Sequence, residues 1–138
     1  MKGFAYLELC YTNFMTPLAL IAEDSAEQAY IFRKSLFMSG YQVEVVNNGL
    51  AASARLKEIV PRIVVLDLHL PGISGEKLLY QIRNDERLKD TKTFLITGDA
   101  GLAEKLRDVA TITLLKPISF AQLSMLATKF LPQTGAFE

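Results

Sequence analysis

The sequence predicts an α/β fold of the doubly wound kind, in which helices cover both faces of a five-stranded parallel sheet. Five short apolar runs alternate along the chain with five segments of helical periodicity. The runs are continuously apolar rather than alternating with polar residues, which is typical of strands that are buried on both faces. The chain has 138 residues, half of them hydrophobic, which suffices for one domain with an ordinary core.

Each predicted strand is a run of apolar residues that ends abruptly at a polar residue or a glycine. The predicted strands cover residues 18–22, 43–46, 63–66, 94–97 and 111–115. The residues that end them are, in chain order, Glu23-Asp24, Asn47-Asn48-Gly49, Asp67, Gly98 and Lys116-Pro117. Polar groups therefore gather at the carboxyl ends of the strands.

The predicted helices share apolar residues at a spacing of three or four. They cover residues 25–40, 52–59, 74–84, 102–109 and 119–132. Ser25 with Gln28 and Ser119 with Gln122 are capping-box patterns that begin the first and last helices. The fourth helix has the weakest pattern, and we expect it to be short or irregular.

Composition limits the domain organisation and the possible partners. We expect residues 1–16 to be an extension or linker, residues 17–132 to form the domain, and residues 133–138 to be a tail. Fifteen basic residues balance fifteen acidic ones, so nothing indicates direct binding to nucleic acid or to a membrane. The single cysteine, Cys10, excludes an intramolecular disulfide, and with no signal-peptide pattern we expect a cytoplasmic protein.

Five polar side chains lie at the ends of four of the predicted strands or directly after them. They are Glu23, Asp24, Asp67, Thr97 and Lys116. In an open parallel sheet these strand ends share one crevice, where ligands bind. Three carboxylates in one crevice favour Mg²⁺ or Mn²⁺, whereas a hydroxyl and an ammonium group favour a phosphoryl group. The simplest chemistry is nucleophilic attack by Asp67 on phosphorus.

These motifs, in this order, resemble the receiver domain of two-component response regulators over residues 17–132. The turn from Leu70-Pro71-Gly72 through Gly75 matches the turn that follows the phosphoacceptor in that family. The resemblance implies a flavodoxin-like (βα)5 three-layer sandwich of CheY type, with strand order 2-1-3-4-5. Such a domain catalyses only its own phosphorylation and dephosphorylation and is otherwise not an enzyme.

The resemblance also implies roles for the site residues. Asp67 would accept a phosphoryl group from a sensor histidine kinase or a histidine phosphotransfer protein. Asp24, Asp67 and the backbone carbonyl of His69 would bind Mg²⁺, and Glu23 would act through water. Thr97 would bond a phosphoryl oxygen.

Further expectations from the resemblance concern the last strand and its surroundings. Lys116 would pair with the phosphoryl group, and the Lys116–Pro117 peptide would be cis. A homodimer could form through the face made by the fourth helix, fifth strand and fifth helix.

Two features depart from the family pattern. The family usually has an aromatic switch residue three positions before the lysine, where this chain has Thr113. A small side chain cannot swing as a ring does, so we expect signalling here to differ from the ring-based mode. His69, two residues after the phosphoacceptor, either tunes hydrolysis of the phosphoryl group or is an exposed loop residue with no such role. Asp99 could pair with His69 from the opposite side of the crevice.

Two other functions use similar features. Haloacid-dehalogenase-like phosphatases also combine an aspartate nucleophile with Mg²⁺, but they need a second aspartate where this chain has His69. A receiver fold that acts as an interaction module without phosphorylation is the other alternative, and Thr113 keeps it open. Phosphorylation by a small phosphodonor, lost in Asp67→Asn, would distinguish the main interpretation from the interaction module.

Overall fold

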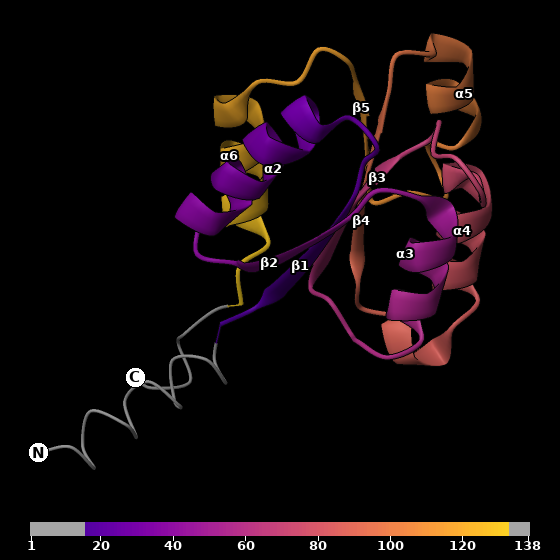
Figure 1. Cartoon of the computed structure of the whole chain (residues 1–138), viewed down its shortest axis with the longest axis horizontal. Helices are drawn as coiled ribbons and strands as arrows, with labels where there is room; N and C mark the ends of the chain where they lie inside the picture. The colour runs from indigo at the N-terminus through magenta and orange to yellow at the C-terminus, as the bar shows by residue number, and fades with distance from the viewer. Residues whose placement is uncertain (1–15, 133–138) are drawn as a thin grey trace, which may run out of the picture.

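The computed structural model describes residues 16–132, which form a five-stranded parallel sheet between two layers of helices (Figure 1). The strand order is β2-β1-β3-β4-β5, as expected. The strands are β1 Leu18–Ala22, β2 Gln42–Val46, β3 Ile63–Asp67, β4 Lys92–Thr97 and β5 Ile112–Leu115. Cys10, the tail and nearly all of the N-terminal extension lie outside the described residues.

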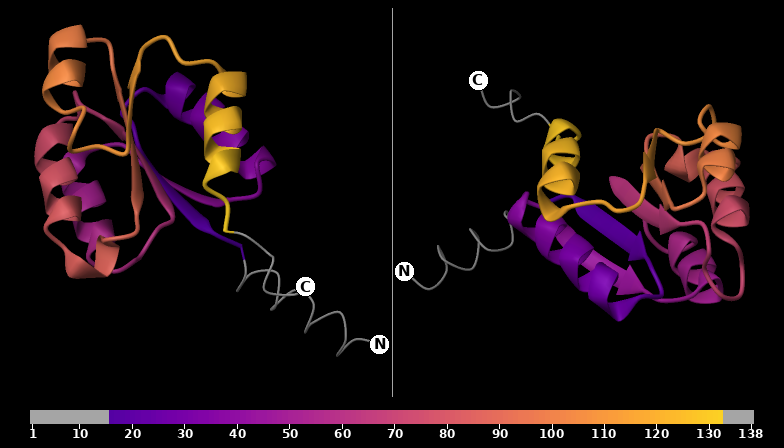
Figure 2. Two further views of the ribbon diagram at one scale, coloured as in Figure 1. Left: turned by 180° about the vertical axis from the view of Figure 1, so that it is seen from behind. Right: turned by 90° about the horizontal axis from the view of Figure 1, so that it is seen from above.

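Helices from both halves of the chain cover the sheet. They are α2 Ala26–Met38, α3 Gly49–Leu56, α4 Gly75–Arg83, α5 Ala100–Lys105 and α6 Phe120–Lys129, with a 3-10 turn η1 at Glu86–Leu88. Helices α2 and α6 lie on one face, and α3, α4 and α5 lie on the other (Figures 1 and 2). Within residues 16–132 no helix is long and apolar enough to span a bilayer.

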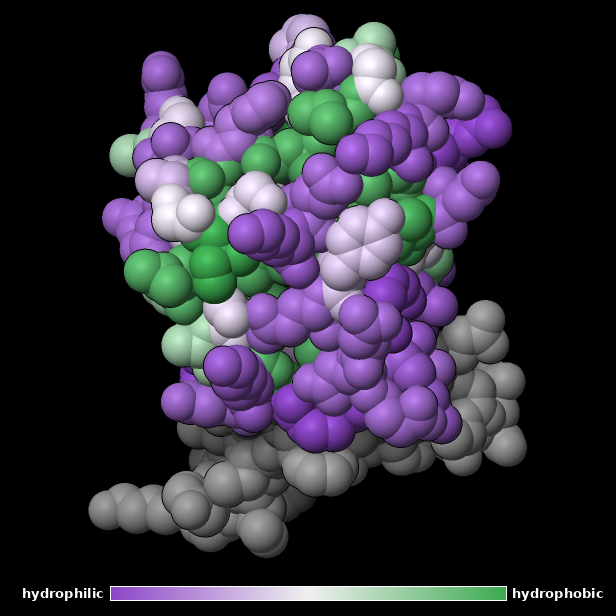
Figure 3. Space-filling model, turned by 90° about the vertical axis from the view of Figure 1, so that its right-hand side faces the viewer, coloured by the Kyte–Doolittle hydropathy of each residue, from purple (hydrophilic) through white to green (hydrophobic). Residues whose placement is uncertain are grey.

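Each face of the sheet has its own core, because successive strand residues point to opposite sides. Ile21, Val65 and Phe94 pack with α2 and α6, whereas Leu20, Leu66 and Leu95 pack with the helices of the other layer. Strand β3 is buried along its whole length, so its last residue is a buried acid. The side that carries α3, α4 and α5 is mainly hydrophilic, with apolar side chains exposed between the polar ones (Figure 3).

The helix boundaries differ from the prediction by three residues or more in α3, in α5 and at the end of α6, which ends at Lys129. Helix α5 begins at residue 100 and ends at 105, because Asp99 caps its first turn and the chain then folds into turns around the Leu106 carbonyl. Helix α3 begins at Gly49, three residues earlier than predicted, because Asn48 accepts a hydrogen bond from the amide of Ala51. The expectation of a short fourth helix is confirmed.

The two predicted capping boxes have different outcomes. Ser119 and Gln122 form the complete reciprocal pair at the start of α6. Ser25 caps α2 by accepting from the amide of Gln28, but its own amide donates to the carboxylate of Glu23 at 3.1 Å. At the start of α2, the carboxylate of Glu23 therefore takes the place of the Gln28 side chain as the acceptor for the Ser25 amide.

Candidate functional site

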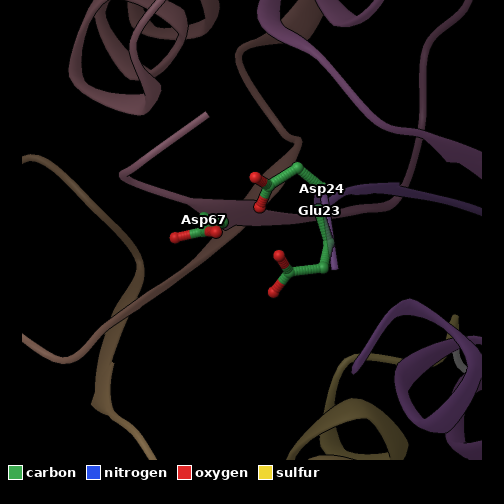
Figure 4. Close-up of side chains that lie close together, drawn as sticks. All are labelled: Glu23, Asp24 and Asp67. Atoms are coloured by element: carbon green, nitrogen blue, oxygen red, sulfur yellow. The ribbon is translucent and has the colours of Figure 1, made fainter. Parts of the chain in front are cut away.

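Three carboxylates meet at the carboxyl end of the sheet. Glu23 and Asp24 directly follow β1, and Asp67 is the last residue of the neighbouring strand β3. One oxygen from each carboxylate lies within 4.8 Å of the others. Figure 4 shows the side chains of Glu23 and Asp24 directed toward Asp67. The structure thus brings together the three acids that the sequence predicted to converge.

The three acids differ in their exposure to solvent. Glu23 is 2% exposed and Asp67 is 4% exposed, whereas Asp24 is exposed. Burial is the main reason that the pKa of Glu23 is raised to about 7, and the neighbouring Asp67 carboxylate contributes to this rise. The amide of Ser25 and the ammonium group of Lys116 act in the opposite direction. A carboxyl group that titrates near neutrality is thus part of the cluster.

Lys116 supplies the positive charge at this site. Its Nζ lies 3.5 Å from Oε1 of Glu23 and 3.6 Å from Oδ2 of Asp67. The amide of Lys116 donates to the carbonyl of Thr97 at 2.8 Å, and its peptide bond to Pro117 is cis, as expected. The end of β5 is therefore joined to the end of β4, with the ammonium group directed at two acids.

Backbone amides orient two of the carboxylates. Oδ1 of Asp67 accepts from the amide of His69 at 3.1 Å, while its Oδ2 faces Lys116. Oε2 of Glu23 accepts from Ser25, which leaves its Oε1 buried without a hydrogen bond. A buried carboxylate oxygen of this kind is a suitable ligand atom for a hard divalent cation. The donor set therefore fits Mg²⁺ or Mn²⁺.

Two glycines allow the chain to pack closely around Asp67. A Cβ at Gly75, the first residue of α4, would contact the carbonyl of Asp67 and lie 2.7 Å from Cα of Leu68. A Cβ at Gly49 would collide with the backbone of Ile73 in the same turn. The starts of α3 and α4 thus enclose the turn after Asp67. This close packing is possible only because both helices begin with a glycine, which has no Cβ.

Thr97 lies at the end of β4 and is fully buried. Its Oγ1 accepts from the amide of Asp99 at 3.0 Å. The carboxylate of Asp99 accepts from two amides of α5 and is thus an N-cap, not the partner of His69 that the sequence suggested. The His69 side chain is exposed.

A hollow of about 340 Å³ opens beside the acidic cluster, between the first turns of α2 and strand β2. Its lining includes Glu23, Asp24, Tyr30, Arg33 and Asn47. Glu23 and Asp24 therefore border an opening on the side of α2.

Sequence reasoning missed several contacts that shape this site. The amide of His69 orients Asp67, and the amide of Ser25 orients Glu23. Both bonds join residues two positions apart, a spacing at which acidic side chains commonly accept from the backbone. The enclosing glycines were visible in the sequence, but the contact between Gly49 and Ile73 joins segments that only the fold brings together.

Comparisons with known proteins agree with this arrangement. Residues 19–127 match the family model for the response regulator receiver domain. The phosphate regulon transcriptional regulatory protein PhoB of Rhizobium meliloti is 29% identical over 112 residues, which cover 79% of this chain and 49% of PhoB. The polar-differentiation response regulator DivK of Brucella ovis is 30% identical over 95 residues, which cover 67% of this chain and 77% of DivK.

A solved structure shows the same fold. The CheY-like response regulator receiver domain from Methylobacillus flagellatus superposes with a TM-score of 0.75 at 29% identity, and the match covers 83% of this chain and 98% of that one. The chain spans only about half the length of PhoB, which is a longer protein than this one. The family match covers most of this sequence, and the chain belongs to the response regulator receiver domains of two-component signalling.

Proposed function

We propose that this domain accepts a phosphoryl group on Asp67, in the presence of Mg²⁺ or Mn²⁺, and so carries a two-component signal. The observation that supports this most strongly is the position of Asp67. It ends a fully buried strand, yet one of its oxygens faces Lys116 and its neighbours are two further acids. Such a cluster costs stability through repulsion and desolvation, which is typical of a functional site.

The proposed reaction is a transfer between two side chains. A carboxylate oxygen of Asp67 attacks the phosphorus of a phosphohistidine. The new O–P bond forms as the P–N bond breaks, and the imidazole leaves with the bonding electron pair and takes up a proton. The amide of His69 holds the Asp67 carboxylate in place during the attack, because it donates to Oδ1.

The metal would be held by this chain's oxygen ligands. Asp24, Asp67 and the backbone carbonyl of His69 are the proposed direct ligands, and Glu23 would act through water. The bound cation would offset the negative charge of the acids and of the incoming phosphoryl group. The buried Oε1 of Glu23 supports this role, since it makes no hydrogen bond and has only the ion pair with Lys116 at 3.5 Å.

Two residues complete the proposed phosphoryl site. Lys116 would pair with a phosphoryl oxygen, exchanging its present ion pair with Asp67 for one with the phosphate. The hydroxyl of Thr97 would donate to another phosphoryl oxygen. In this structure the hydroxyl oxygen accepts from the amide of Asp99.

The proposed phosphodonor is a sensor histidine kinase or a histidine phosphotransfer protein in the cytoplasm. The family membership supports this class of partner. Homodimer formation through α5, β5 and α6 is part of the same proposal. The side chain of Leu115 on β5 is exposed on that side.

Incubation with acetyl phosphate and Mg²⁺ tests the proposal. We expect a species heavier by one phosphoryl group in the intact mass spectrum, which does not form when a chelator is present from the start and is absent in Asp67→Asn. The matched control is Asp90→Asn, which changes an exposed acid away from the cluster and should leave the adduct unchanged. A wild-type chain without an adduct would favour the phosphorylation-independent interaction module.

A further inference from the structure

An exposed apolar surface runs along helix α2 and the neighbouring strand β2. Tyr30 and Phe37 lie two turns apart on one side of α2 and are 56% and 69% exposed, and Val45 of β2 is exposed as well. Two hollows of about 340 and 270 Å³ follow this surface and share Tyr30 and Arg33 in their linings. We call Tyr30, Arg33, Phe37 and Val45 the α2–β2 flank. Apolar side chains gathered in this way commonly mark a surface that another segment covers.

Strand β2 lies at an edge of the sheet and leaves part of its backbone open. The amide of Gln42 and the carbonyl of Val46 bond to residues that flank β1, at 2.8 and 3.1 Å. Because backbone groups alternate in direction along a strand, those of Val43 and Val45 point away from β1, and within residues 16–132 they form no hydrogen bond. Natural sheets protect such an edge with lysine, proline or a covering segment. Strand β2 has neither lysine nor proline, and its single acid is held in an ion pair with α3.

The N-terminal extension joins the domain beside this open edge. Pro17 leads into β1, and its carbonyl accepts from the amide of Gln42, the first residue of β2. A short connection joins the end of α2 to the same residue, so α2, β2 and the extension meet at one end of the sheet. Residues 1–15 can reach up to about 50 Å when extended, whereas Phe37 and Tyr30 are about 11 Å apart along the helix axis. The extension is therefore long enough to follow the whole α2–β2 flank.

The sequence of the extension suits an edge strand. Residues 4–11 read FAYLELCY, in which Glu8 is the only charged residue. Aromatic residues of this kind are enriched in strands. Successive side chains of a strand point to opposite faces, which separates an uncharged set that includes Leu7 and Leu9 from a set that includes Glu8 and Cys10. The uncharged set matches the apolar side chains of the α2–β2 flank.

We propose that residues 4–11 add to the open edge of β2 as a further strand and cover the α2–β2 flank. The added strand runs antiparallel to β2, because the chain must turn before it enters β1, which is parallel to β2. Its main chain bonds to the outward groups of Val43 and Val45, and its uncharged set packs on Tyr30 and Phe37. The occupant of this surface is thus a segment of the same chain, and the inference does not depend on phosphorylation.

A nitroxide spin label on Cys10, the only cysteine in the sequence, tests the proposal in the full chain. Cys10 belongs to the set that contains Glu8, so the label points away from the apolar flank. The unpaired electron broadens the amide NMR signals of residues close to the label. We expect the signals of Val43 and Val45 to broaden relative to the chain with chemically reduced label. The signal of Tyr80 should stay sharp, because α4 lies on the other side of the sheet (Figure 1).

Amide exchange in the chain without a spin label is the second measurement. We expect the outward amides of Val43 and Val45 to be protected in wild type. Leu9→Ser removes an apolar side chain from the contact and should speed the exchange of both amides at least about tenfold. Glu8→Ser is the matched control, because it changes the neighbouring residue of the other set, and it should leave their exchange unchanged.

A mixture of two chains distinguishes the possible occupants. An isotope-labelled chain without the nitroxide is mixed with a nitroxide-labelled chain of natural isotope content, and no broadening of Val43 and Val45 is expected. Broadening in this mixture would show that a second copy covers the flank and would overturn the inference. Sharp signals in the singly prepared labelled chain would overturn it too, since the edge would then be open. Exchange that is equally slow in wild type and Leu9→Ser would exclude the uncharged set as the contact.

Discussion

Replacement of Glu23 by glutamine should make the metal-free domain more stable, and the gain should depend on pH. Glu23 is buried next to Asp67, and burial raises its pKa from the usual 4.5 to about 7. The unfolded chain has no such environment, so its Glu23 ionises near 4.5. Glutamine keeps an oxygen that accepts from Ser25 but carries no charge at any pH.

The sign of the effect follows from proton binding in the two states. Between pH 4.5 and 7 the folded chain keeps the Glu23 proton that the unfolded chain has lost. The free energy of unfolding therefore falls as pH rises through this window, and the loss is complete above pH 7. A rise in pKa from 4.5 to about 7 corresponds to a loss of about 3 kcal/mol.

Urea unfolding at a series of pH values, in the presence of a chelator, measures this effect. The difference in unfolding free energy between Glu23→Gln and wild type should grow from pH 4.5 to pH 7 and level off at about 3 kcal/mol. Glu27→Gln, which changes an exposed acid in the first turn of α2, is the matched control and should show no such growth. A Glu23→Gln difference that is constant with pH would refute the reasoning.

Three further predictions concern packing and charge. Gly75→Ala should lower the unfolding free energy measured in urea titrations by about 1–3 kcal/mol, because the added Cβ would overlap with backbone atoms. Gly98→Ala is the control and should cost less than half of that, because its Cβ would meet nothing within 4 Å. Lys116→Met should slow phosphorylation by acetyl phosphate at least about tenfold in intact-mass time courses, because the positive charge at the phosphoryl site is lost; an unchanged rate would argue against its proposed role. Tyr41→Phe should cost about 1 kcal/mol of unfolding free energy, since the hydroxyl donates to the buried carbonyl of Ala127 at 2.8 Å, and an equal stability would contradict this.

The fold was largely predictable because its signals are local. Each strand is an apolar run with a clear end, and Ser119 with Gln122 marks the start of α6 by chemistry alone. The end of α5 was not predictable, because residues 106–109 keep apolar side chains at helical spacing. Leu106 packs in the core, yet its carbonyl accepts from the amides of both Val109 and Ala110, which closes turns in place of a helix.

Which polar side chains gather at the carboxyl end of the sheet was also predictable, since each lies at the end of a strand or directly after it. The orientation of the carboxylates was not. The amide of Ser25 was expected to pair with Gln28, but the carboxylate of Glu23 is nearer and takes that bond.

The central claim is that Asp67 is the residue that accepts phosphate, and site-resolved mass spectrometry tests it most directly. The domain is incubated with acetyl phosphate and Mg²⁺, treated with borohydride to reduce the acyl phosphate, and digested with trypsin. We predict reduction to homoserine at Asp67, within the peptide covering residues 63–77, and at no other acid. Reduction at Asp24 or Glu23 instead, or an unmodified peptide 63–77 from a phosphorylated chain, would contradict the claim.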